Sequence, residues 1–571
     1  MTKTTRSRGV LVLGVVSALA LLQSLRAAPA QFAPPVEVPL PALLEVQSDA
    51  WLWTSFDGVE ILSLAAEDVT RTMAENVAVQ RANLEALVPA DHRVTWDRPM
   101  MVVFYGTGNP RPMPIQFVVI LQKKLTEQER ARAVENREGK PLEVFPNPQI
   151  LPSTWAEEAD QLCVFNIVTP TRGRELSPIP ASSYVRYLLE SRTPPHPQWF
   201  IDGFIAFYGR GNVVGREMEL APIVWISGAQ TQLMMRDKKI RPELVPLTEL
   251  FAWTTPGAVT DERMRSLLTS QAELFIRWAF DARGSGGAEA LWSFLAGPTT
   301  GPGSAGRFEK CFGMTEAAAL ESIRAYFPTA IRKPTRLNLR RDSRAPEVAI
   351  RSATPVEIAR IKSEWDRLGG RIVGREHPEL QPFYHEQARR TLERVPEALA
   401  SDPELLASKG LLFVDTGDDA SALPLIERAC AAERPRPRAA VELARIQVAR
   451  AREVAVDGRL DAATIEKATA PLRGVLSTKP PMALAYQVLA EAWIGAASAA
   501  PAADLDRLLE GARLLPRDVP MLIAIARLMI EQGRIRDAQD VIERGLTYVT
   551  DDGGRRRLFA IRSAARAAAP K

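Results

Sequence analysis

Residues 521–545 read MLIAIARLMIEQGRIRDAQDVIERG, and this stretch decides the fold of the C-terminal part of the chain. Small and large apolar residues recur in it with helical spacing on both sides of Gly533. They are Leu522, Ile525, Ala526, Met529, Ala538, Ile542 and Gly545. Small residues allow two helices to cross closely, and a glycine readily forms the turn between them. The stretch therefore predicts a pair of packed helices that meet near Gly533.

Three earlier segments show the same spacing, and a half-unit over 383–395 precedes them with Ala388 and Leu392 in phase. The first begins at Pro403, the second begins 34 residues later at Pro437 and has an insertion near 454–464, and the third follows it. The matching positions of the first segment are Leu406, Gly410, Phe413, Gly417, Ala422, Ile426 and Ala429. Those of the second are Leu443, Ala444, Ala468, Leu472, Val475 and Pro480. Those of the third are Tyr486, Leu489, Ala490, Trp493, Leu508 and Pro516.

This pattern resembles tetratricopeptide (TPR) repeats. The alternative is a generic helical bundle rich in alanine and leucine, but such a bundle has no reason to place glycine at both Gly417 and Gly533. The resemblance implies an all-α TPR superhelix over residues 365–571. Stacked repeats of this kind curve and leave a concave face, on which we expect a protein or peptide partner to bind.

The N-terminus has the pattern of an export signal. Lys3, Arg6 and Arg8 precede an apolar run over 9–22, and Ala28-Pro29-Ala30 supplies small residues for cleavage. The run has about 14 residues, fewer than the roughly 20 that span a bilayer, which favours a cleaved signal peptide (1–30) over a membrane anchor. We therefore expect an exported protein, periplasmic or extracellular, with no transmembrane segment in the mature chain.

Composition excludes two classes of protein. The 72 basic and 68 acidic residues nearly cancel, and no basic block is interleaved with aromatics, so a nucleic-acid partner is not expected. Three cysteines are too few for a disulfide framework. A single bridge between Cys163 and Cys311 remains open at this point. Cys430 lies in a repeat helix and is expected to be a small buried residue.

Residues 45–328 predict an α+β domain, with strands first and helices after. A proline-rich lead (31–44) precedes this domain, and a basic, proline-punctuated linker (329–364) follows it. The expected strands are a pair over Trp51–Ser63 turning at Asp57-Gly58, then Met100–Tyr105, Ile115–Leu121 and Leu162–Val168. The expected helices are Leu64–Leu87, Ser183–Ser191, Pro197–Tyr208, Ser270–Ala282, Ala288–Leu295 and Thr315–Tyr326.

Residues 197–208 read PQWFIDGFIAFY. This segment resembles the P-x-W-[L/F]-x-E-G-[L/F]-A-x-[Y/F] helix of gluzincin zinc peptidases, the peptidase MA-like group. Weaker similarities at Pro246–Phe251, Gln271–Ile276 and Phe308–Gly313 extend the resemblance over about residues 45–328. In that family the glutamate before the glycine is the third zinc ligand, and an H-E-x-x-H helix comes shortly before it.

The zinc-binding residues of that family are missing. The resemblance aligns Ser183 and Tyr187 with the two histidines, Tyr184 with the catalytic glutamate, and Asp202 with the third ligand. Serine is a poor zinc ligand, and a tyrosine hydroxyl with its usual pKa of about 10 is protonated at neutral pH. The alignment therefore implies a pseudopeptidase with no catalytic residue, no metal and no other cofactor.

Several further residues have structural interpretations that we prefer to functional ones. Asp202 is expected to pair with Arg186 or Arg210, and His196 to be a solvated loop histidine rather than a displaced metal ligand. His385-Glu386 is assigned to the surface, because Arg389 stands where a second histidine would be needed. The aromatic residues Trp199, Phe200, Phe204, Phe207 and Tyr208 are expected in the core rather than in a ligand groove.

The sequence thus predicts an exported, non-catalytic binding protein that joins a pseudopeptidase domain to a TPR array. The alternative is an envelope hydrolase with a metal-independent or displaced site around Tyr184, Tyr187 and Asp202. A third possibility is a structural envelope protein whose N-terminal domain only positions the array.

Overall fold

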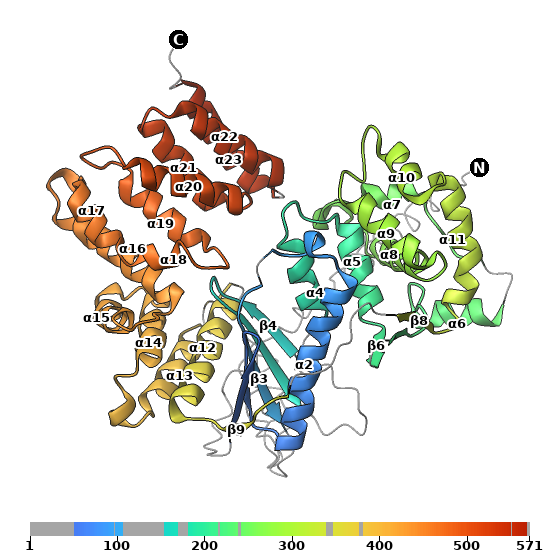
Figure 1. The fold of residues 1–571 in the computed structure, drawn as a ribbon, viewed down its shortest axis with the longest axis horizontal. Helices are drawn as coiled ribbons and strands as arrows, with labels where there is room; N and C mark the ends of the chain where they lie inside the picture. Colours follow the sequence, from blue (N-terminus) through green and yellow to red (C-terminus); the bar gives the residue numbers. More distant parts are fainter. Residues whose placement is uncertain are drawn as a thin grey trace, which may run out of the picture. The chain divides into compact units, whose positions relative to one another are not determined.

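The computed structural model of the chain describes residues 51–95, 97–106, 153–168, 181–214, 217–237, 241–338, 347–375, 378, 381–549 and 551–567. These residues belong to one compact unit, made of Glu45–Pro112 and Pro152–Lys571. The expected signal peptide, the proline-rich lead and the β-rich run Ile115–Leu121 lie outside them. An α+β region is followed by a helical region (Figure 1), which confirms the fold class at this coarse level.

A mixed sheet forms the core of the first region, with the strand order β4-β5-β3-β2-β1-β9 among the described residues. The strands are β1 (Leu52–Phe56), β2 (Val59–Ser63), β3 (Met100–Gly106), β4 (Ser153–Glu157), β5 (Leu162–Val168) and β9 (Arg351–Ser352). Strands β2, β3 and β5 run parallel, whereas β1, β4 and β9 pair antiparallel with their neighbours. The expected hairpin of β1 and β2 is present, and Asp57 (φ 42°) and Gly58 (φ 74°) form its turn.

Both faces of this sheet are covered by helices (Figure 1). On one face, Ile61 belongs to a core shared with α2 (Glu67–Leu87). On the other face, Phe165 stacks on Trp365 of α12 (Pro355–Val373), with ring centroids 5.1 Å apart. Strands buried on both faces have continuous apolar sequences, which explains the run from Met100 to Phe104.

The segment expected to be a linker (329–364) instead supplies strands to two sheets. The second sheet consists of β6 (Gly211–Val214), β7 (Glu217–Leu220) and β8 (Thr335–Asn338). Strand β8 pairs with β7, and β9 extends the first sheet beside β1. Helix α12 begins within this segment, where Thr354 and Glu357 form a capping box. The expected boundary between linker and repeats therefore falls inside a helix that packs on the sheet.

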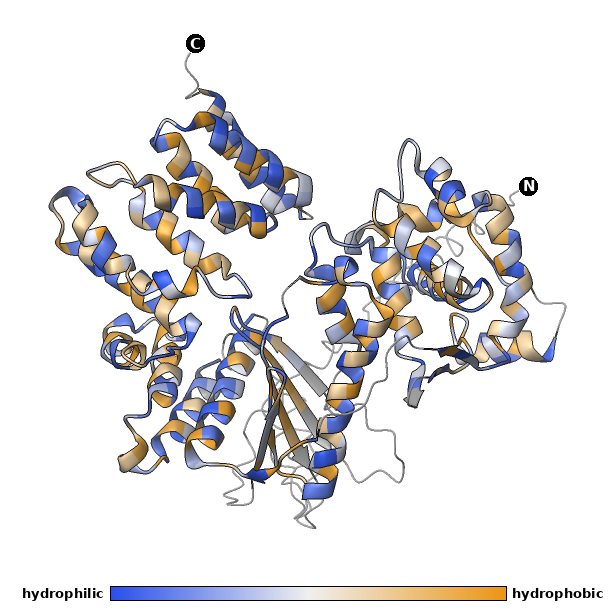
Figure 2. Cartoon of the chain, viewed as in Figure 1, coloured by the Kyte–Doolittle hydropathy of each residue, from blue (hydrophilic) through white to orange (hydrophobic). Residues whose placement is uncertain are grey.

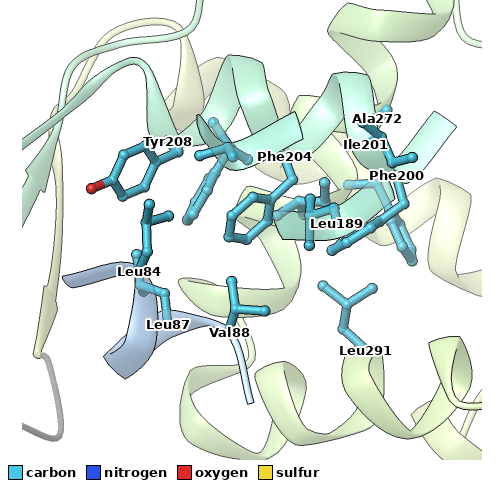
Figure 3. Packing of buried hydrophobic residues seen from close by; sticks show 14 of the residues in the cluster. Leu84, Leu87, Val88, Leu189, Phe200, Ile201, Phe204, Tyr208, Ala272 and Leu291 are labelled. Atoms are coloured by element: carbon cyan, nitrogen blue, oxygen red, sulfur yellow. The ribbon is translucent and has the colours of Figure 1, made fainter. Parts of the chain in front are cut away.

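The aromatic side chains of α5 belong to the core of the first region, and α5 packs on α4 and α8. Eight α-helices are described between β5 and β8. They are α4 (Ala181–Glu190), α5 (Gln198–Tyr208), α6 (Gly228–Arg236), α7 (Leu247–Ala252), α8 (Glu262–Phe280), α9 (Gly284–Leu295), α10 (Ser304–Phe312) and α11 (Glu316–Ala330). Figure 3 shows Tyr208 beside Leu84 of α2, Phe204 near Val88, and Phe200 near Leu291 of α9. The aromatic residues of α5 are buried, which confirms that they belong to the core.

Gly203 allows α5 and α8 to pack closely. A Cβ atom on Gly203 would lie 2.5 Å from the Ala272 Cβ and 2.9 Å from the Ala272 carbonyl carbon. Overpacking of this kind costs about 1–3 kcal/mol, and the better helix propensity of alanine returns up to about 1 kcal/mol. We therefore expect Gly203→Ala to lower the free energy of unfolding in urea by up to about 2 kcal/mol.

Gly306 in α10 provides the matched control, because a Cβ atom there would meet nothing within 4 Å. Gly306→Ala should leave the protein equally stable or more stable. If both variants lose the same free energy of unfolding, Gly203 is not needed for the close packing of α5 on α8.

The second region consists of helices that pack largely on their neighbours in sequence (Figures 1 and 2). After α12 they are α13 (Gln381–Glu393), α14 (Pro403–Asp415), α15 (Asp419–Cys430), α16 (Pro437–Val454), α17 (Ala462–Thr469), α18 (Leu472–Val475), α19 (Ala483–Trp493), α20 (Ala502–Leu514), α21 (Val519–Glu531), α22 (Ile535–Tyr548) and α23 (Asp552–Ala567). Gly417 (φ 77°) lies between α14 and α15, and Gly533 (φ 72°) lies between α21 and α22. The predicted placement of both glycines at helix turns is thus confirmed.

Within the part of the chain that the structure describes, no helix combines the length and apolar character needed to cross a bilayer.

Cys163 is buried in β5, and Cys311 and Cys430 are partly buried. All three are free thiols, so Cys163 and Cys311 are not bridged.

Candidate functional site

The four positions aligned with a zinc site lie on two packed helices. Ser183, Tyr184 and Tyr187 belong to α4, and Asp202 belongs to α5. Both tyrosines are buried, whereas Ser183 and Asp202 are half-buried. The structure therefore places all four positions in one part of the molecule, and their chemistry depends on what each side chain contacts.

The Tyr184 hydroxyl is held by a carboxylate. It donates a hydrogen bond to Asp97 Oδ2 at 2.6 Å, and Arg81 Nη2 contacts the same oxygen at 3.0 Å. Burial raises the pKa of Tyr184 well above its usual value, and the negative charge of Asp97 raises it further. The hydroxyl is therefore protonated at neutral pH, and it cannot polarise a water molecule as the aligned glutamate would.

We expect Tyr184→Phe to lower the free energy of unfolding by about 1–3 kcal/mol, because a buried hydrogen bond to a charged group is lost. Tyr548→Phe is the control, since Tyr548 is half-buried and its hydroxyl forms no hydrogen bond with any described residue. Urea titrations of both variants measure the difference. Similar small changes in the two would mean that the Tyr184–Asp97 contact contributes little.

Tyr187 is also committed to a structural contact. Its hydroxyl accepts a hydrogen bond from the backbone N–H of Arg98 at 3.3 Å. Its ring stacks on that of Tyr184 with centroids 6.2 Å apart, and Trp155 of the edge strand β4 lies 6.0 Å from it. Burial raises the pKa of Tyr187 well above its usual value. The two tyrosines and Trp155 thus form a packed aromatic cluster beside the edge of the sheet.

Asp202 pairs with Arg186 of α4, as one of the two alternatives from the sequence predicted. Arg186 Nη2 lies 2.6 Å from Asp202 Oδ1, and Nη1 of the same guanidinium lies 2.6 Å from Glu190. The other candidate partner, Arg210, instead contacts Glu273 of α8 at 2.6 Å. Asp202 therefore links α4 to α5.

These residues do not fit a zinc ion. A catalytic zinc site takes three protein ligands from histidine, cysteine and carboxylate side chains. Of the aligned residues only Asp202 belongs to these types, and Arg186 already occupies its carboxylate. Over the described ranges, no three His, Cys, Asp or Glu side chains are grouped so that they could hold a metal ion.

A pair of stacked histidines lies beside α5, and the expectation that His196 is solvated is wrong. His196 is 3% exposed, and its ring lies 5.3 Å from that of His92. Its Nε2–H donates to the backbone carbonyl of His92 at 2.9 Å, and Phe200 and Trp292 lie against the pair. Burial, together with the positive charge of Arg192, lowers the pKa of His196 to about 3. Both rings are neutral at pH 7, because burial also lowers the pKa of His92.

A buried ionic cluster connects the sheet with the helical region. It comprises Glu158 and Asp160 from the β4–β5 turn, Glu364, Arg367 and Arg371 from α12, Asp415 from α14, and Arg436 just before α16. Arg367, 1% exposed, lies at its centre. Its guanidinium contacts Glu158 at 2.6 Å and Asp415 at 2.6 Å. It also contacts Glu364 at 3.0 Å.

The arginines keep the buried carboxylates of this cluster ionised. Burial alone would raise the pKa of Glu364, but Arg367 and Arg436 outweigh it and lower this pKa to about 2. Burial would also raise the pKa of Glu158, but Arg367 and Arg371 outweigh this effect and lower that pKa even more strongly. One signal of this cluster is present in the sequence: charged residues occupy positions of α12 that its helical spacing assigns to the buried face.

Of the His385-Glu386 pair that the sequence assigned to the surface, only Glu386 lies near it, whereas the His385 imidazole is half-buried and its Nε2 is inaccessible to solvent. Glu386 pairs with Arg389 at 2.7 Å and with Arg390 at 2.8 Å near the surface of α13. Burial lowers the pKa of His385.

Comparison with known proteins gives no relative on which to base an assignment. None of the protein-family models, curated proteins or solved structures compared with this chain matches it.

Proposed function

We propose that this chain is an exported, non-catalytic binding protein in which a degenerate gluzincin-like domain is joined to a TPR-like array. One observation carries the proposal. The functional groups at the positions aligned with a zinc site are used for structural contacts: Tyr184 with Asp97, Tyr187 with a backbone amide, and Asp202 with Arg186. A side chain held in this way is not available as a metal ligand or a general base.

The helical region supports the binding role. Its helices form hairpins at Gly417 and Gly533 and pack in sequence order, as stacked repeats do. In a TPR-like array the concave face would present a continuous surface to an extended partner. We therefore propose a protein or peptide as the partner of this region.

Metal analysis and peptidase assays on the mature chain test the lack of catalysis. We expect less than stoichiometric zinc and no cleavage of a chemically unfolded protein, with identical results for wild type and Asp202→Asn. Stoichiometric zinc together with cleavage would overturn the proposal. A metal-independent activity that Asp202→Asn abolishes would instead favour the envelope hydrolase centred on Tyr184, Tyr187 and Asp202.

Cross-linking in the native cell envelope tests the partner site. Cross-linked peptides should map to residues 381–567, the helices after α12, if the array holds the partner. Cross-links confined to residues 51–338 would contradict this assignment. N-terminal sequencing of the same sample tests export, since cleavage after Ala30 would leave Gln31 as the first residue.

A further inference from the structure

A cavity of about 730 Å³ lies among α13, α14 and α15. Its apolar lining consists mainly of Pro382, Leu392, Leu412, Phe413 and Leu425. The volume falls within the range of roughly 300–1,000 Å³ that is typical of small-molecule sites. The cavity therefore has the size and the apolar walls of a ligand site, and its polar groups indicate which ligand would fit.

The charged side chains around the cavity neutralise one another, with one exception. Arg389 contacts Glu386 at 2.7 Å and Glu393 at 2.5 Å. Asp415 belongs to the buried ionic cluster, where it pairs with Arg367 and Arg371. Lys409 lines the cavity from α14, is half-buried, and forms no ion pair with any described residue.

Lys409 is consequently the positive charge of this cavity that lacks a counter-ion. The imidazole of His385 also lines the cavity, and because burial lowers its pKa it is neutral at pH 7. A half-buried ammonium without a partner favours an anionic group beside it, since charge-assisted hydrogen bonds are the stronger ones.

The cost of burying backbone amides favours a simple lipid-like ligand over a peptide. A bound peptide brings amide N–H and C=O groups, each of which costs free energy if it is buried without a hydrogen bond. The guanidinium of Arg389 is already paired, and the Thr416 hydroxyl donates to the Phe413 carbonyl at 2.9 Å. An acyl chain makes no such demand, and its single anionic head group can pair with Lys409.

We propose that the cavity among α13, α14 and α15 binds an amphiphilic carboxylate, a medium-chain fatty acid, with its carboxylate on the Lys409 ammonium and its chain against Leu392, Leu412 and Leu425. This ligand site goes beyond the proposed partner binding and does not depend on it. The binding is reversible and involves no covalent step.

Calorimetric titration of the mature full-length chain with decanoate tests the site. Wild type should bind decanoate saturably with one-to-one stoichiometry. Lys409→Met removes the charge and keeps the length of the side chain, so we expect it to weaken decanoate binding about tenfold or more. Decanol, which has no charge, should bind wild type and Lys409→Met equally.

Two further variants distinguish binding in the cavity from nonspecific binding of decanoate elsewhere on the protein. Lys467→Met removes an exposed lysine of α17, outside the cavity, and should leave decanoate affinity unchanged. Thr416→Trp places a large side chain at an exposed position of the cavity lining and should abolish binding of both decanoate and decanol. Circular dichroism establishes that each variant is folded. If Lys409→Met does not fold, Lys409→Gln is used in its place.

The proposal is overturned if wild type does not bind decanoate, or if Lys409→Met and Lys467→Met bind it equally well. It is also overturned if an apolar peptide occupies the cavity, shown by protection of Thr416→Cys from thiol labelling, while decanoate gives no protection. Envelope cross-links to the helical region would be unaffected by any of these results, so the two proposals fail separately.

Discussion

Replacing Arg367 by alanine should lower the free energy of unfolding by about 3–5 kcal/mol, because the change leaves buried carboxylates without their main counter-ion. Arg367 is 1% exposed, and the carboxylates of Glu158 and Glu364, which it contacts, are buried as well. Without the guanidinium these negative charges face each other in a region of low dielectric constant. We expect α12 to lose its firm attachment to the sheet, which urea titration followed by tryptophan fluorescence would detect through Trp365.

Arg389→Ala is the matched control for this experiment. Arg389 also contacts two carboxylates, those of Glu386 and Glu393, but all three side chains are substantially exposed. Exposed ion pairs are screened by water and contribute little to stability, so this variant should be nearly as stable as wild type. Arg367→Lys keeps the charge without the forked geometry and should fall between the two. A loss below 1 kcal/mol in Arg367→Ala would mean that the buried ionic cluster does not stabilise the fold.

Lowering the pH from 7.5 to 5.0 should cost about 2 kcal/mol of stability through His196 alone. Its pKa is about 3 in the folded chain and about 6.5 in an unfolded chain. Between these values the unfolded state binds more protons than the folded state, so stability rises with pH and falls on acidification. The loss begins as the pH drops below about 6.5, at about 1.36 kcal/mol per pH unit.

The pH dependence itself distinguishes this effect from a simple packing defect. His196→Gln should reduce the difference in unfolding free energy between pH 7.5 and 5.0 by about 2 kcal/mol, whatever its stability at neutral pH. The carboxylates of the buried ionic cluster contribute little in this window, because an unfolded glutamate titrates near 4.5. His385→Gln is the comparison variant at a half-buried position. An unchanged pH dependence in His196→Gln would show that His196 is not held neutral by the fold.

Part of the candidate site followed from the sequence, and part did not. The resemblance pointed to Ser183, Tyr184, Tyr187 and Asp202, and the structure places these residues on two packed helices. The sequence alone left Asp202 with two possible arginine partners. Only the packing of α4 on α5 selects Arg186, because it brings the two side chains to 2.6 Å.

The sequence by itself determined the features that depend on neighbouring residues. Helical spacing predicted the aromatic core of α5, and single glycines marked the turns at Gly417 and Gly533. The Asp57-Gly58 pair likewise marked the first hairpin. Each of these depends on backbone preferences or periodicity within one short segment, where the local sequence is sufficient.

The tertiary structure alone decided the features that join distant segments. Strand β9 pairs with β1 although it lies in the expected linker, His196 stacks on His92, and Arg367 meets Glu158 across a separation of 209 residues. A strand partner, a ring contact or an ion pair forms only after folding has brought both segments together. No periodicity within either segment specifies the other, and for that reason these contacts could not be read from the sequence of one chain.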